Sequence, residues 1–283
     1  MARIIGNVFT SHVPAIGGAI AKGRTQDAYW KPFFDGFPPL RHWLKETRPD
    51  IVVVAYNDHG LNFFLDKMPT FAVGAADSYR NADEGWGIPQ TKPFVGDVDL
   101  SWHLVEQLVA DEFDITTCQE MLVDHALTLP MALLWPEQDW PVKIVPVCIN
   151  TVLFPLPSAA RCFRFGQAIG RAIENFPGEQ KVLVMGTGGL SHQLEGERAG
   201  HINKPFDTQF MDSLTRDPAW ATRQSINELV KAGGTQGIEL LNWLVARGAT
   251  EATGRAVREL HRTYHVPISN TAGAVMLLDS APT

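Results

Sequence analysis

Four histidines in the sequence each follow a run of apolar residues that is typical of a buried strand. His12 follows RIIGNVF, His59 follows IVVVAY, and His192 follows VLVMGTGGLS. His125, within VDHALTLP, lies eight residues beyond a strand-like run that ends at Thr117. Because loops at the carboxyl ends of strands converge at one edge of an α/β sheet, where ligands bind, we expect these histidines to share a rim. Imidazole is both a neutral metal ligand and a proton acceptor near neutral pH, so the cluster indicates a metal site or a proton-transfer site.

For any one of these histidines, the alternative is an ordinary loop residue that bonds a backbone carbonyl. Four histidines at comparable positions make that alternative weaker than it would be for one. Five further histidines fall in helix-like or flanking segments, where we expect solvation or helix capping. These are His42, His103, His201, His261 and His265.

A carboxylate that could complete a metal site stands in the apolar segment GIELLNWLV, where it is Glu239. Burial of this acid would be costly without a nearby cation or hydrogen-bond donor. The alternative is a first-turn glutamate that complements the dipole of its own helix. Asp58 and Asp124 each precede a candidate histidine and could orient it as hydrogen-bond acceptors, although loop hydrogen bonding is the favoured interpretation for both.

Other chemistries have weaker signals. The glycines of Gly186–Gly189 match neither GxGxxG nor GxxxxGK[ST], so a close approach of the chain to a site is favoured over nucleotide binding. Ser191 stands beside His192, but the GxSxG elbow of serine hydrolases is absent. The three cysteines are spaced too far apart for a CxxC motif, and we expect each to be a buried, reduced thiol. These are Cys118, Cys148 and Cys162.

The elements that must position these residues are read from apolar periodicity. Strands are predicted at Arg3–Phe9, Ile51–Tyr56, Thr70–Val73, Phe113–Thr117, Val142–Ile149, Val182–Met185 and Ala274–Leu278. Helices are predicted at Pro38–Glu46, Leu100–Asp111, Ala159–Asn175, Gly237–Arg247 and Ala252–Tyr264. This alternation predicts one α/β domain over residues 1–283, with a central, mostly buried mixed sheet flanked by helices. Two irregular segments, Ala75–Asp97 and Gln193–Lys204, are long enough to be binding loops.

The composition limits the partners of the protein. The 283 residues are 45% hydrophobic, which is sufficient for a large buried core. A formal net charge of -7, from 24 basic and 31 acidic residues, offers no basic surface for nucleic acid or anionic lipid. No apolar run reaches the roughly 18 to 20 residues that span a bilayer, and the first residues lack a signal-peptide pattern. We therefore expect a cytoplasmic protein that binds neither nucleic acid nor membrane.

Seven segments, taken in order over about residues 1 to 279, carry a resemblance to a known family. They are FTSHVPAIGGAI, VVAYNDHGLNFF, ADEGWG, MLVDHALTLP, MGTGGLSHQLEGERAGHIN, GGTQGIELLNWLVARGA and YHVPISNTAGAVML. The sequence resembles the protocatechuate 4,5-dioxygenase β-chain group of the class III (LigB-type) extradiol ring-cleaving dioxygenase family.

The resemblance implies a site for Fe(II) and assigns residues to it. Two histidines and one carboxylate, which match His12, His59 and Glu239, would hold the metal as the facial triad of non-haem iron oxygenases. His192 matches the general base and acid, and His125 matches a second, non-ligand histidine that contacts substrate. The remaining matches are substrate-binding positions: Asn57 as a polar neighbour, with Ser269 and Asn270 on the ring carboxylate, although Ser-Asn is also an ordinary turn sequence.

The resemblance also implies a reaction and a partner. We expect O2-dependent cleavage of protocatechuate at the 4,5 bond to 4-carboxy-2-hydroxymuconate 6-semialdehyde, in the catabolism of lignin-derived aromatic compounds. Gallate or 3-O-methylgallate is the alternative substrate, because one ring substituent changes only a few contacts. A zinc hydrolase or a non-catalytic subunit on the same fold is a more distant alternative. The expected assembly includes a separate small helical α subunit, as α2β2, or else is a homodimer.

Overall fold

The site is built on one mixed sheet of eight strands, seen in a computed structural model that describes residues 1–85 and 87–280. The strand order is β10-β11-β1-β9-β2-β8-β3-β6. Their bounds are β1 Arg3–Thr10, β2 Ile51–Tyr56, β3 Phe71–Gly74, β6 Thr116–Cys118, β8 Lys143–Ile149, β9 Lys181–Thr187, β10 Val257–Ile268 and β11 Thr271–Ser280. The four central strands β1, β9, β2 and β8 run parallel, whereas β11 pairs antiparallel with β1, and β3 with β8. The predicted fold class is confirmed.

The central strands are apolar throughout because both faces of the sheet are covered. Every residue of β2 is buried. Successive side chains of a strand point to opposite faces, so Ile51, Val53 and Ala55 enter one hydrophobic core. Val52 and Val54 enter the other. This double burial fixes the register of the strand and therefore the position of the polar residues that follow it.

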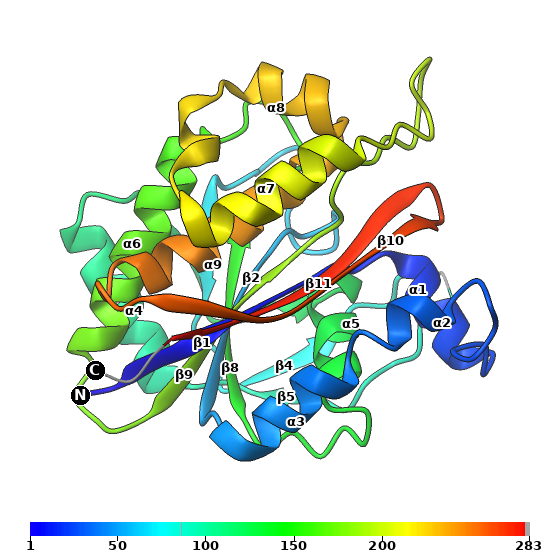
Figure 1. Ribbon diagram of the computed structural model, residues 1–283. Coiled ribbons are helices and arrows are strands. Elements are labelled where there is room, and N and C mark those ends of the chain that lie inside the picture. Colours follow the sequence, from blue (N-terminus) through cyan, green and yellow to red (C-terminus); the bar gives the residue numbers. More distant parts are fainter. Residues whose placement is uncertain (86, 281–283) are drawn as a thin grey trace.

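Helices cover both faces of the sheet (Figure 1). The core on one face is filled from α4 (Val98–Ala110), α6 (Ala159–Asn175), α7 (Lys204–Arg216) and α9 (Leu240–Glu251), and α8 (Ile226–Gly233) adds Leu229 to it. The core on the other face is filled from α1 (Pro14–Ala21), α2 (Lys31–Phe34), α3 (Pro38–Thr47) and α5 (His125–Leu134). Short 3-10 turns at η1 (Trp220–Arg223) and η2 (Gly237–Glu239) precede α8 and α9. The predicted helix Ala159–Asn175 coincides with α6.

A small second sheet anchors the segment Ala75–Asp97, which was expected to be irregular. Its strands are β4 (Ser78–Asn81), β5 (Phe94–Val95) and β7 (Leu122–Val123), in the order β5-β4-β7. The parallel pairing of β4 with β7 brings the residues after β4 to the beginning of α5. Trp86, the tryptophan of ADEGWG, lies outside the described residues.

One predicted element is wrong. The segment Ala252–Tyr264 was predicted as a helix, but most of it belongs to β10, which pairs antiparallel with β11 at the edge of the sheet. Its charged side chains suit an exposed edge strand, and this long-range pairing overrides the local pattern. The prediction of buried, reduced cysteines is confirmed, because all three are buried and free. Among the described residues, no helix is long and apolar enough to span a membrane.

Candidate metal centre

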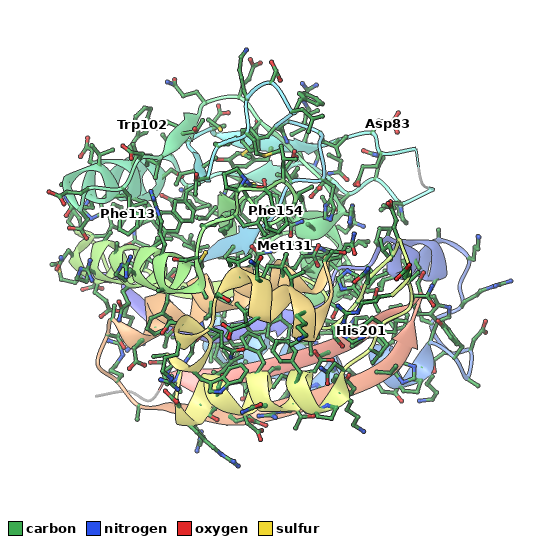
Figure 2. The ribbon with its side chains drawn as sticks, turned by 90° about the horizontal axis from the view of Figure 1, so that it is seen from above. Asp83, Trp102, Phe113, Met131, Phe154 and His201 are labelled. Carbon is green, nitrogen blue, oxygen red and sulfur yellow. The ribbon has the colours of Figure 1, made fainter. Side chains whose placement is uncertain are left out.

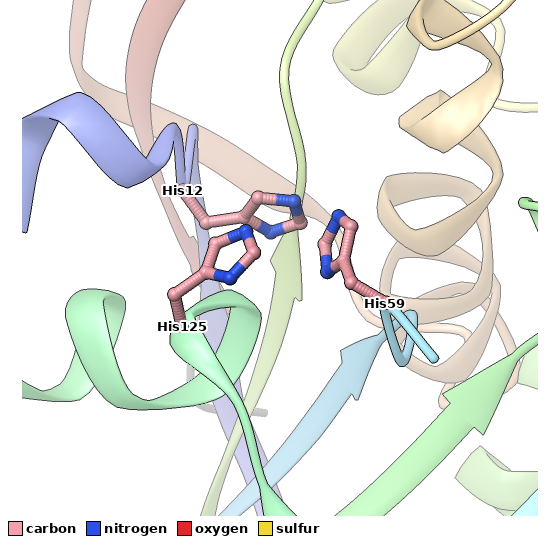
Figure 3. A group of neighbouring side chains, drawn as sticks. All are labelled: His12, His59 and His125. Atoms are coloured by element: carbon pink, nitrogen blue, oxygen red, sulfur yellow. The ribbon is translucent and has the colours of Figure 1, made fainter. Parts of the chain in front are cut away.

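Histidines from three separate elements meet at the carboxyl edge of the parallel strands. His12 follows β1, His59 follows β2, and His125 is the first residue of α5. Their rings lie close together, with centroids 5.3 Å apart for His12 and His59 and 4.2 Å apart for His59 and His125 (Figure 3). One nitrogen from each ring lies within 4.8 Å of the others, close enough for the group to hold a metal ion. The predicted convergence of these residues is therefore observed.

Glu239 brings a carboxylate to this group from the junction of η2 and α9. Its Oε1 lies 3.3 Å from His12 Nε2 and 3.5 Å from His59 Nε2, and the residue is only 6% exposed. The backbone N–H of Gly189 donates to the other oxygen, Oε2, over 2.8 Å. Gly188 has a φ of 149°, and a Cβ at this position would lie 2.7 Å from the Cβ of Glu239. The glycine-rich turn therefore serves a close approach of the chain to the site, as expected.

The remaining nitrogen of each candidate ligand is anchored, which aims its Nε2 at the carboxylate. His59 Nδ1 lies 2.8 Å from Asp124 Oδ2, and His12 Nδ1 lies 3.1 Å from Thr187 Oγ1. Asp124 therefore orients His59 from across the site, and not His125, its neighbour in sequence. Asp58 instead accepts hydrogen bonds from backbone N–H groups of its own loop, as the sequence favoured.

The charges at this site favour a cation. Burial alone would lower the pKa of His59, but the carboxylates of Asp124 and Glu239 raise that pKa to about 10. Burial would raise the pKa of Glu239, yet His12 and His59 hold it well below its usual range. With a proton on Nδ1 facing Asp124, His59 would direct the lone pair of Nε2 at Glu239 Oε1, and the Nδ2 of Asn57 lies within 3.3 Å of both acceptors. A metal ion bound by both atoms would satisfy them further. Two imidazole nitrogens and one carboxylate oxygen are a donor set that fits a divalent transition metal.

Asn57 lies behind the ligand group and does not line the cavity. Its Nδ2 donates to Glu239 Oε1 over 3.3 Å and lies 3.2 Å from His59 Nε2, and its Oδ1 accepts from Asn242 Nδ2 over 2.9 Å. Asn242 Nδ2 also donates to the Thr187 carbonyl, which can only accept, so the orientation of both amides is determined. The predicted contact of Asn57 with substrate stays a prediction, while its hydrogen bonds indicate that it supports Glu239.

Two further histidines present lone pairs to the cavity. His192 Nδ1 lies 2.9 Å from the Leu190 carbonyl and must donate to it, which leaves Nε2 without a proton in the neutral ring. His125 Nδ1 lies 2.5 Å from Glu84 Oε2, and its Nε2 is buried with no hydrogen-bond partner in the described part of the chain. Burial, followed by the nearby charge of His59, lowers the pKa of His125, so its neutral form is favoured. Sequence reasoning missed Glu84, although the acidic segment ADEGWG within a long loop was a signal for it.

A cavity of about 1130 Å³ opens over these groups. Ser269 stands at its edge, whereas Asn270, its partner in the β10–β11 turn, is exposed and is not among the described residues that line the cavity. Three apolar side chains of the lining, Val152, Phe154 and Leu194, are more than half exposed. Phe154 lies on the face of the molecule seen from above in Figure 2. The cavity therefore has histidines and carboxylates at its base, and its exposed lining combines these apolar side chains with charged ones such as Lys22, Arg24 and Glu195.

Ser191 is not available as a nucleophile. It is fully buried, and its Oγ donates to Asp207 Oδ2 over 2.6 Å while accepting from the backbone N–H of Asn203. The serine hydrolase interpretation, already disfavoured by the sequence, has no geometric support here. Of the five other histidines, none is among the described residues that line the cavity. Three of them bond backbone carbonyls, namely His103, His201 and His265.

Comparisons with known proteins agree with this geometry. Residues 6–274 match the family model described as the catalytic LigB subunit of aromatic ring-opening dioxygenase. Gallate dioxygenase of Pseudomonas putida (strain KT2440) is 40% identical over 200 residues, which are 70% of this chain and 58% of that protein. The 2,3-dihydroxyphenylpropionate/2,3-dihydroxicinnamic acid 1,2-dioxygenase of Photorhabdus laumondii is 27% identical over 320 residues, covering 97% of this chain and 96% of that protein. The enzyme of that name from Rhodococcus jostii is 32% identical over 263 residues, covering 77% and 82%. The chain thus spans little more than half the length of the gallate dioxygenase that it matches.

Proposed function

This chain belongs to the family of the catalytic LigB subunit of aromatic ring-opening dioxygenases, and we propose that it cleaves a catecholic acid with O2 in an extradiol reaction at non-haem Fe(II). The observation that carries the proposal is the convergence of His12 Nε2 and His59 Nε2 on one carboxylate oxygen of Glu239. These three residues would hold the metal on one side. The cavity would leave its other side open to substrate and O2.

Gallate is the first substrate to test. The sequence alone put protocatechuate first and gallate second, but the 40% identical relative is a gallate dioxygenase, which favours the alternative. The two acids differ by one ring hydroxyl, so few contacts separate them. A hydroxyl at the edge of the cavity, such as that of Ser269, is suited to hydrogen-bond a polar substituent of the ring.

The protein's own side chains would perform the proton transfers. Bound Fe(II) would supply a Lewis acid for the ring hydroxyls and a path for electrons from the ring, which is the reductant, to O2. The unprotonated Nε2 of His192 would take a proton from a ring hydroxyl as the catechol binds as an anion, and the resulting imidazolium would later return it. The Nε2 of His125 would accept a hydrogen bond from substrate, because its Nδ1 is held by Glu84.

Exposed apolar side chains in the cavity lining support a partner that covers the cavity. Val152, Phe154 and Leu194 line it and are 52%, 58% and 54% exposed. Burial of such side chains would exclude water from the site and strengthen its electrostatic interactions. The occupant would be a separate small helical subunit, in an α2β2 assembly, or a second copy of this chain.

Anaerobic reconstitution with Fe(II), followed by O2 uptake with gallate and protocatechuate side by side, tests the proposal. We expect stoichiometric O2 consumption with both acids, a yellow semialdehyde product from protocatechuate only, and the higher kcat/KM for gallate. Zn(II) in place of Fe(II) is the control and should give no O2 uptake. Absence of uptake with Fe(II), even after addition of a candidate small subunit, would refute the dioxygenase and favour a hydrolase or a non-catalytic subunit.

A further inference from the structure

The carboxylate of Glu84 holds His125 at two points. Its Oε1 accepts the backbone N–H of His125 over 2.7 Å, and its Oε2 lies 2.5 Å from Nδ1 of the ring. Both side chains are nearly inaccessible, at 6% and 5% exposure. Glu84 also lines the cavity, although it comes from the loop between β4 and β5, more than 40 residues before the histidine.

This arrangement determines where the ring carries its proton. A carboxylate only accepts hydrogen bonds, so an Nδ1 at 2.5 Å from it must carry hydrogen. In the neutral ring, Nε2 then has a lone pair and no hydrogen. That atom is buried, and no other described residue offers it a hydrogen bond. A buried acceptor without a partner is costly, and a substrate hydroxyl in the cavity would satisfy it.

The position of Glu84 is fixed from the loop side as well. Asn81, the last residue of β4, closes the loop, because its Oδ1 accepts the backbone N–H of Thr91 over 2.7 Å. The opposite side of the contact is the first turn of α5, where Asp124 caps the helix by accepting from Ala126 N–H. The free N–H groups of this turn favour a second carboxylate, which Glu84 provides.

We propose that Glu84 is a positioning residue that fixes the Nδ1–H tautomer of His125, so that the cavity presents a hydrogen-bond acceptor to a substrate hydroxyl. That His125 Nε2 binds a substrate hydroxyl rests on the proposed function, whereas the tautomer of His125 does not. Asp124 has no such effect on His125, because its Oδ2 is directed at His59.

Glu84→Gln tests the tautomer directly. The oxygen of the glutamine must remain at the backbone N–H of His125, since an amide NH2 there would face another donor. Its NH2 group then faces Nδ1, which has to accept, and the hydrogen moves to Nε2. We expect 15N NMR of the histidine rings, in the metal-free and the Zn(II)-loaded protein, to show this inversion for His125. Retention of the Nδ1–H form in Glu84→Gln would overturn the proposal whether or not the protein is a dioxygenase.

Steady-state kinetics test whether Glu84 acts through His125. Glu84→Gln should raise the KM for gallate roughly tenfold or more, with unchanged Fe(II) content, because the acceptor has become a donor. In a His125→Ala background the same substitution should change kcat/KM by less than about twofold. Asp83→Asn is the matched control, since Asp83 is an exposed acid of the same loop (Figure 2) and should leave both readouts unchanged. Additive losses in the double variant would show that Glu84 only supports the loop, and would also overturn the proposal.

Discussion

The Nδ1 of His59 lies 2.8 Å from Oδ2 of Asp124, a contact that joins the end of β2 to the first turn of α5. Asp124 is the N-cap of α5, and its other oxygen accepts the N–H of Ala126. One carboxylate thus sets the direction of a proposed metal ligand and the beginning of the helix that carries His125. The proposed metal ligands and the hydrogen bonds that orient them are consequently built as a unit.

Asp124→Asn separates these two roles of the carboxylate. Asparagine caps helices about as well as aspartate. However, Asp124 Oδ2 also accepts the backbone N–H of His59 over 2.9 Å, and an amide NH2 at this place would face that donor, so we expect a loss of roughly 1–3 kcal/mol in stability. The charge that orients His59 and raises the basicity of Nε2 is lost, and we expect metal affinity to fall roughly 10- to 100-fold. Asp97→Asn, at the N-cap of α4, is the control and should bind metal like the wild type. Equal metal affinities in competition with a chelator for Asp124→Asn and wild type would contradict this role.

Metal binding should release a proton from His59. In the metal-free protein the pKa of His59 is raised to about 10, so at neutral pH its ring is protonated. A metal ion needs the Nε2 lone pair and must displace that proton, so the affinity weakens as pH falls from about 10, by up to tenfold per pH unit. Calorimetry in buffers of different ionisation enthalpy should find about one proton released per metal from this group. A dissociation constant that does not vary between about pH 7 and 9 would refute the assignment.

Asn57→Ala distinguishes support of the metal ligands from contact with substrate. Loss of the amide leaves Glu239 Oε1 without one donor and Asn242 without an acceptor. We expect roughly tenfold weaker metal binding, because hydrogen-bond partners of ligands are worth about that much. The KM for substrate, measured with saturating metal, should stay within about twofold of wild type. A large rise in KM with unchanged metal affinity would instead support the substrate contact predicted from the sequence.

The convergence of His12 and His59 could be predicted from the sequence because each follows a strand that is easily recognised. The apolar runs before His12 and His59 are continuous, and the edge at which parallel strands end is a general property of α/β sheets. Glu239 was open to two interpretations, since the beginning of a helix also suits an acid. Glu239 lies at the beginning of α9 and its side chain is directed at the histidines, so the two interpretations do not exclude each other.

The surroundings of these ligands could not be predicted in the same way. The contact between Glu84 and His125 depends on β4 and β7, strands of four and two residues that leave no periodic pattern. The helix α5 is buried on almost every side and contains Pro130, so it has no apolar stripe to recognise. The edge strand β10 is held by pairing with β11, which is information that lies outside its own segment.

His192→Phe should separate proton transfer from metal binding. His192 is not within the group of candidate ligands, and its Nδ1–H donates to the Leu190 carbonyl. Its Nε2 therefore remains available to a substrate in the cavity, which His192 lines. A phenyl ring has a similar shape but no base, and we expect normal Fe(II) content with turnover reduced roughly 10²- to 10⁴-fold, the usual contribution of a general base. His201→Phe removes an imidazole that bonds the Ala232 carbonyl in the same segment, and should retain most of the activity. An undiminished rate in His192→Phe would remove this residue from the mechanism and leave His125 as the base.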